Sequence, residues 1–263
     1  MLTPDDIRAR WATGEPTYGL WAALSDPFAI ELAALSDLDY ICLDQQHGTI
    51  DFAHLGSLLP AAERHGVLPI TRVPANEPWV ISRALDAGAM GVVVPMVSTP
   101  AQAAAVVASC RYAPHGIRSF GPIRAAIAAG TSDPRRLESV LCIVMVETVE
   151  GLANLDEIAA TPGVDAIYIG PADLGLSLGV APTLDPVEPR HAEAIQAIRE
   201  ACEKAGIAAG IQCNDGAHAR RQVEAGFRMI TIAKDSALLQ SAVSRELAAA
   251  RGDAVPTGPA AYS

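Results

Sequence analysis

The chain has 263 residues, which is enough for one large domain or two smaller ones. Its formal net charge of −11 argues against nucleic-acid binding as the main activity, because a phosphate backbone attracts basic proteins. No uninterrupted apolar run reaches the ~18 residues that cross a bilayer, and the acidic N-terminus does not resemble a signal peptide. The five scattered cysteines are typical of reduced core residues. We therefore expect a cytoplasmic protein without membrane or nucleic-acid partners.

Short apolar runs recur along the chain at the spacing of one strand–helix unit. They cover residues 18–24, 40–44, 68–73, 91–96, 142–147, 166–170, 208–213 and 229–234. Each run is β-branched and continuous rather than alternating, which is typical of a strand that is buried on both faces. The sequence therefore predicts eight parallel strands.

Ala- and Leu-rich stretches of helical length separate these runs. Several end in a glycine that can adopt the left-handed conformation after a helix, namely Gly66, Gly88, Gly206 and Gly226. Pro78, after Glu77, and Pro100, after the capping pair Ser98-Thr99, mark helix starts. The alternation predicts a single-domain TIM (β/α)8 barrel over residues 1–251, with an open doubly wound sheet as the alternative. Residues 252–263 are predicted to form a flexible tail, and the long stretch 111–133 an active-site loop.

Polar side chains follow the predicted strands at the point where each strand ends. In a parallel barrel these carboxyl ends open onto one face, and catalysis takes place there. The polar residues at this face are Asp44, His47, Arg72, Glu147, Asp173 and Lys234. We therefore expect them to surround one site.

Glu147 and Asp173 follow consecutive strands, so their carboxylates can meet at one point. Two hard oxygen ligands without a matching Cys or His suit Mg²⁺, Mn²⁺ or Co²⁺, and they leave positions for water and substrate. The alternative interpretation is that both residues cap helices.

Arg72 can grip a substrate carboxylate or stabilise a developing oxyanion, and it can equally form an ion pair with Asp44 or Glu147. Asp44 lies close enough to His47 in the chain to orient the imidazole for general-base catalysis. The alternative is a solvated loop histidine beside an aspartate that caps a helix.

Lys234 opens a different mechanism, because a lysine at a strand end can form a Schiff base with a carbonyl substrate. The other lysine of the chain, Lys204, lies in a predicted helix. A salt bridge of Lys234 at the barrel rim is the structural alternative.

Four segments resemble the HpcH/HpaI family of class II pyruvate aldolases: LDQQHGTID, TRVPANEPWVISRALDAGAMGVVVPMVST, RYAPHGIRSFGP and VMVETVEGLANLDEIAATPGVDAIYIGPADLGLSLG. The similarity runs from residue 18 to residue 247. It implies that Glu147 and Asp173 bind a divalent metal cation and that Arg72 contacts the pyruvate oxygen. It also implies that His47, held by Asp44, takes part in proton transfer.

The resemblance has implications for the remaining site residues as well. The main chain of Gly170, Pro171, Ala172 and Asp173 is expected to hold the pyruvate carboxylate. Asp86 is expected to reach the site of a neighbouring subunit in a hexamer, a trimer of dimers with swapped C-terminal helices. Gln46 and Met145 depart from the residues common in the family, and both departures put substrate choice in doubt more than reaction type.

The predicted function is therefore a divalent-metal-dependent aldolase, a carbon–carbon lyase. It would cleave 4-hydroxy-2-oxo acids reversibly to pyruvate, or a close 2-oxo acid, and an aldehyde through an enolate. The alternatives are a Schiff-base aldolase that uses Lys234, a lyase of CoA thioesters like the citrate lyase β-subunit, and a non-catalytic barrel that binds a 2-oxo acid.

Overall fold

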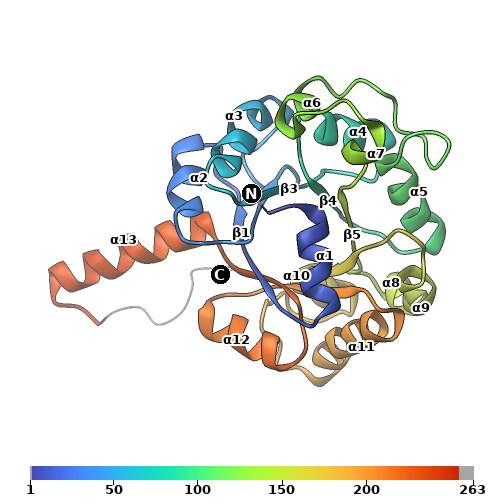
Figure 1. The fold of residues 1–263 in the computed structure, drawn as a ribbon. Helices are drawn as coiled ribbons and strands as arrows, with labels where there is room; N and C mark the ends of the chain where they lie inside the picture. The colour runs from blue at the N-terminus through green and yellow to red at the C-terminus, as the bar shows by residue number, and fades with distance from the viewer. Residues whose placement is uncertain (1, 255–263) are drawn as a thin grey trace.

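The eight apolar runs form a closed parallel barrel, in which each strand pairs with the next and the last pairs with the first (Figure 1). The computed structural model describes residues 2–254. The strands are β1 (Thr17–Ala22), β2 (Tyr40–Asp44), β3 (Leu68–Arg72), β4 (Gly91–Val94), β5 (Leu141–Met145), β6 (Ala166–Ile169), β7 (Ala208–Gln212) and β8 (Met229–Lys234). The predicted TIM barrel is confirmed, and the open sheet is wrong.

Helices between the strands return the chain from the end of one strand to the start of the next and form the outer ring in Figure 1. The described helices also include one before the first strand and one after the last. They are α1 (Pro4–Ala12), α2 (Pro27–Ala34), α3 (Phe52–Glu63), α4 (Pro78–Asp86), α5 (Pro100–Cys110), α6 (Ile123–Ala129), α7 (Pro134–Leu137), α8 (Val149–Ala153), α9 (Leu155–Ala159), α10 (Pro171–Ser177), α11 (Pro189–Ala205), α12 (Gly216–Glu224) and α13 (Asp235–Arg251).

Local signals in the sequence fix where these helices begin and end. Before α5, the Thr99 hydroxyl accepts a hydrogen bond from the Gln102 N–H, while the Gln102 side chain accepts one from the Thr99 N–H. This reciprocal cap satisfies two N–H groups that a helix start would otherwise leave without partners. Gly206 ends α11 at φ 73°, a conformation that glycine adopts without the steric cost of a Cβ.

Two apolar layers hold the barrel together, one inside it and one between the strands and the helices. Inside, Trp21 stacks on Tyr168 with ring centroids 5.1 Å apart. The hydroxyl groups of Tyr40 and Tyr168 both meet the Thr231 hydroxyl, at 2.9 and 2.7 Å, so these polar ends are satisfied in the core. The barrel interior is therefore filled, and space for a ligand is left only toward its ends.

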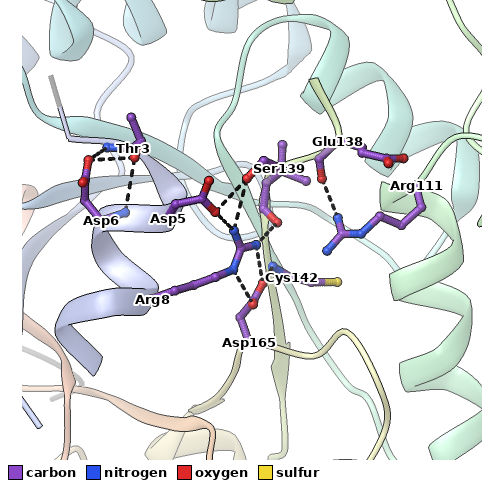
Figure 2. Close-up of polar contacts among 10 residues, drawn as sticks. Thr3, Asp5, Asp6, Arg8, Arg111, Glu138, Ser139, Cys142 and Asp165 are labelled. Carbon is purple, nitrogen blue, oxygen red and sulfur yellow. Dashed lines mark hydrogen bonds and ion pairs between the residues drawn. The ribbon is translucent and has the colours of Figure 1, made fainter. Parts of the chain in front are cut away.

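Helix α1 crosses the amino end of the barrel, and Arg8 fastens it there (Figure 2). The Arg8 guanidinium donates to both carboxylate oxygens of Asp165, at 2.7 and 3.0 Å, and to the Val140 carbonyl at 2.7 Å. Asp165 also accepts a hydrogen bond from the Cys142 N–H at the start of β5. This end of the barrel is thus closed by a partly buried ion pair, and the carboxyl end remains for a site.

Helix α13 behaves differently from the others, because it points away from the barrel (Figure 1). Its large apolar side chains are exposed: Leu238, Leu239, Val243 and Leu247. It ends at Gly252, and most of the predicted flexible tail, residues 255–263, lies outside the described residues. Within residues 2–254, no helix is long and apolar enough to cross a membrane.

Candidate active site

A cavity of about 280 Å³ opens at the carboxyl end of the strands. Most of the predicted site residues line it: His47, Arg72, Gly170, Pro171, Ala172, Asp173 and Lys234. Residues at the ends of β2, β3, β6 and β8, or just after them, thus line one cavity, as their positions in the sequence predict. Their chemical roles stay predictions at this point.

Asp44 and Arg72 end neighbouring strands and are directly paired in the sheet register. The Arg72 Nε donates to Asp44 Oδ1 at 2.9 Å and its Nη2 to Oδ2 at 2.7 Å, a two-point ion pair that is almost fully buried. Burial opposes the charge on Asp44, but the Arg72 hydrogen bonds outweigh it and hold the pKa of this carboxyl below its usual value. The guanidinium also lies 5.0 Å from the centre of the Trp21 ring.

The structure gives Asp44 a different contact with His47 from the one expected. Asp44 Oδ1 accepts hydrogen bonds from the main-chain N–H groups of Gln46, at 3.0 Å, and His47, at 3.2 Å. Across the described residues, no hydrogen bond joins Asp44 to the imidazole. The carboxylate therefore shapes the turn that carries His47 and does not orient its ring, which is exposed at the pocket.

Glu147 follows β5 and is buried, with 2% of its surface exposed. Its Oε1 accepts a hydrogen bond from the Met96 N–H at 2.8 Å, whereas Oε2 is buried and finds no hydrogen-bond partner within residues 2–254. Met96 presents this N–H from a left-handed conformation, φ 59°, which is uncommon for a residue with a side chain. Burial raises the pKa of Glu147 to about 7; the Met96 hydrogen bond and Arg72 oppose the rise, and the charge of Asp173 adds to it.

The unpartnered oxygen of Glu147 faces the turn that opens α10. A Cβ at Gly170 would overlap Glu147 Oε2, so the glycine leaves room for the carboxylate. Asp173 lies in the first turn of the same helix and lines the pocket. A buried carboxylate oxygen without a partner, beside a second carboxylate, fits a divalent cation. No group of three or more His, Cys, Asp and Glu side chains with metal-ligand spacing occurs among residues 2–254, so the remaining ligands would be water and substrate.

Several pocket residues escaped the sequence analysis. Trp21 and Tyr168 line the cavity from inside the barrel, and Asn214 and Gln240 line it from the segment after β7 and from α13. Trp21 lies inside the first predicted strand, 18–24, and not at its end, so the search for polar residues at strand ends passed over it; in the structure it pairs with Lys234 one residue before β1 ends. The Met96 N–H could not have been found, since a main-chain donor leaves no residue-type signal.

One prediction fails within this chain, and the role expected of Asp86 in the site of a neighbouring subunit stays a prediction. The stretch 111–133 was expected to be an active-site loop, yet none of its residues lines the pocket. It follows helix α5 and precedes β5, which places it at the amino end of the barrel. Asp86 lies near it at the end of α4 and pairs with Arg118 at 2.7 Å, so it is not part of this chain's own pocket.

Comparisons with known proteins agree with the fold. The family model described as HpcH/HpaI aldolase/citrate lyase matches residues 17–242. A hydroxypyruvate/pyruvate aldolase from Rhizorhabdus wittichii is 39% identical over 246 residues, which cover 93% of this chain and 98% of that protein. A 5-keto-4-deoxy-D-glucarate aldolase from Escherichia coli is 34% identical, covering 92% of this chain and 95% of the relative. The crystal structure of an HpcH/HpaI aldolase/citrate lyase family protein from Burkholderia cenocepacia superimposes with a TM-score of 0.87 at 36% identity, over 93% of this chain and 98% of that one.

Proposed function

The chain belongs to the HpcH/HpaI aldolase/citrate lyase family, and we propose that it is a divalent-metal-dependent aldolase acting on 4-hydroxy-2-oxo acids. The products would be pyruvate, or a close 2-oxo acid such as hydroxypyruvate, and an aldehyde. The observation that carries this proposal is the buried Glu147 Oε2, which lies against Gly170 and has no hydrogen-bond partner among residues 2–254, while the charge of Asp173 acts on the same carboxyl group.

Glu147 and Asp173 would hold the cation, with Mg²⁺, Mn²⁺ and Co²⁺ all suited to two carboxylates. A divalent ion there supplies Lewis-acid polarisation of the substrate carbonyl. The main-chain groups from Gly170 to Asp173 would hold the 2-oxo acid carboxylate, since Gly170 lets a ligand approach the backbone closely.

Arg72 supplies fixed positive charge at the mouth of the barrel. Asp44 holds it from two points and the Trp21 ring lies below it, so the guanidinium is oriented before substrate binds. It would stabilise the negative charge that develops on the enolate oxygen. His47, exposed at the same pocket, would take the proton from the C4 hydroxyl in cleavage and return it in synthesis.

We also propose that the chain works as a homo-oligomer, with the hexamer of the family as the expected state. The support is α13, which leaves the barrel with Leu238, Leu239, Val243 and Leu247 exposed. Large exposed apolar side chains along one helix mark an interaction surface. Asp86 lies far from this chain's own pocket, so a role for it requires a neighbouring copy. The five cysteines are free and buried, which supports the cytoplasmic location that we propose.

The test is exchange of the pyruvate C3 protons in deuterated buffer, followed by NMR, which requires no knowledge of the aldehyde. We expect exchange that stops with a chelator and returns with Mg²⁺, Mn²⁺ or Co²⁺. Glu147→Gln should lower it at least about 100-fold, whereas Glu150→Gln, an exposed position on α8, should not change it. Exchange that survives chelation would contradict the proposal and favour a Schiff base, which borohydride trapping on Lys234 would detect.

A further inference from the structure

Lys234 places an ammonium group in the pocket that no described residue neutralises. It ends β8, is half-buried and lines the cavity. Across residues 2–254, no hydrogen bond or ion pair joins its Nζ to another side chain. Arg72, the other cation of the pocket, is held by Asp44 instead, and the other lysine, Lys204, pairs with Asp156 on the surface at 2.8 Å.

The strand register shows which way Lys234 faces. It pairs with Trp21 of β1, and Trp21 lies inside the barrel against Tyr168. Ala233, the preceding residue, packs in the outer layer between strands and helices. Because side chains alternate along a strand, Lys234 faces the barrel mouth.

Lys234 also lies away from the part of the pocket that the carboxylates occupy. Glu147 and Asp173 follow β5 and β6, whereas Lys234 ends β8, with β7 between them in the ring. The polar cavity-lining residues just after β7 and on α13 are neutral: Asn214, Ser236 and Gln240. The pocket thus has Asp173 at one end, with the buried Glu147 near it, and at the other end Lys234, a cation without an ion-pair partner among the described residues.

An unpaired ammonium in a partly buried pocket favours an anion as its partner, because a charge-assisted hydrogen bond there is stronger than one in water. The chain as a whole carries a net charge of −11, so the positive charge of Lys234 contrasts with the overall negative charge. The 2-oxo acid would be held at the carboxylate end, so the group that meets Lys234 belongs to the second substrate.

Resting on the aldolase function proposed above, we propose that Lys234 is a specificity residue that binds a carboxylate on the acceptor aldehyde. The preferred acceptors are then aldehydes that carry a second, anionic end. A single ammonium with hydroxyl and amide neighbours matches a singly charged carboxylate, whereas a phosphate monoester normally takes several cationic or main-chain donors.

The experiment compares acceptors that differ only in charge. Condensation with pyruvate is followed by NMR for glyoxylate and 4-oxobutanoate, each against its methyl ester, so that two chain lengths are covered. The enzymes are the wild type, Lys234→Met, Lys234→Arg and Lys204→Met. Pyruvate C3 exchange is measured on all four, and thermal unfolding confirms that each is folded.

We expect Lys234→Met to lower the carboxylate-to-ester ratio of kcat/KM by about 10- to 100-fold for at least one chain length, mainly through the acceptor KM. Lys234→Arg should restore much of the ratio, and Lys204→Met should leave it unchanged. An unaltered ratio in Lys234→Met, or an equal loss with acid and ester, overturns the inference while the aldolase proposal stands. A wild type without pyruvate exchange overturns the aldolase proposal, and this inference with it.

Discussion

Gly170 and Glu147 lie so close together that the side chain of any other residue at position 170 would overlap the Glu147 carboxylate. The conflict is with Oε2, the oxygen that has no hydrogen-bond partner. The backbone of Gly170 has φ −95°, which every residue type can adopt, so the glycine is required for space and not for conformation. The turn before α10 thus leaves space for one oxygen of the Glu147 carboxylate.

Gly170→Ala is therefore expected to displace the Glu147 carboxylate. Metal-dependent pyruvate exchange should fall at least about tenfold, while overpacking lowers the free energy of unfolding by about 1–3 kcal/mol. Gly216→Ala is the matched control, because a Cβ there meets no atom within 4 Å. Exchange and metal affinity that remain at the wild-type level would show that Glu147 Oε2 has no part in binding the cation.

The Asp44–Arg72 pair predicts strong coupling in folding stability. Arg72→Met leaves a buried carboxylate without its partner and Asp44→Asn leaves a buried guanidinium, so each should lower the free energy of unfolding by about 3–5 kcal/mol. The double variant should lose clearly less than the sum of the two. Urea unfolding measures all three, and additive losses would mean that the ion pair contributes little.

The same variants separate packing from chemistry. Pyruvate exchange should fall more in Arg72→Met than in Asp44→Asn, because only Arg72 lines the cavity. Equal losses in the folded variants would assign Arg72 a purely structural role.

His191 predicts a pH dependence of stability. It is fully buried on α11, neither ring nitrogen has a clear hydrogen-bond partner among residues 2–254, and burial lowers the pKa of the imidazole more than the Pro171 main chain and Glu188 raise it. The unfolded chain therefore binds a proton at His191 more readily than the folded one does below pH ~6.5. The free energy of unfolding should fall as the pH drops below this value, by at most about 1.4 kcal/mol per pH unit from this residue.

The measurement is urea unfolding at pH 8 and pH 5 for the wild type, His191→Gln and the exposed control His65→Gln. The loss of stability between the two pH values should be smaller in His191→Gln than in the other two proteins. The same loss in all three would exclude His191 as a source of acid sensitivity.

Helix α13 predicts the behaviour of the protein in solution. Leu239 and Val243 are each 59% exposed, so Leu239→Glu should place a charge in the proposed contact between copies. We expect sedimentation velocity to show an oligomer for the wild type and smaller species for this variant at the same concentration. Ala192→Glu, at an exposed position of α11, should leave the oligomer intact. A monomeric wild type would contradict the proposed assembly.

The sequence was sufficient for the barrel because its strands are buried on both faces. Burial on both sides requires a continuous apolar run, and the predicted bounds of β2 and β8 agree with the structure at both ends. The polar residues at the strand ends could also be predicted from the sequence to share one site, since parallel strands bring their carboxyl ends to one face. Arg72 and Asp173 were located by this rule alone.

The sequence analysis missed two kinds of feature: the end of the barrel on which a connection lies, and the hydrogen bonds that main-chain N–H groups donate. The length of the stretch 111–133 suggested a catalytic loop, but a connection from a helix to a strand lies at the amino end of the barrel. The short separation of Asp44 and His47 brought the carboxylate to the main-chain N–H instead of the ring. The Met96 N–H that holds Glu147 depends on a backbone conformation that no residue pattern announces.

Helix α13 carries two sets of side chains with different surroundings. Ser236, Ala237 and Gln240 line the cavity beside Lys234, and Leu239 and Val243 are exposed on the same helix. A contact that immobilises the exposed side chains also limits the movement of the cavity-lining ones, because a continuous helix moves as one body. If copies of the chain meet through α13, the preference for one aldehyde over another depends on protein concentration. Dilution separates the copies, and the α13 residues that line the cavity are then held less firmly in place.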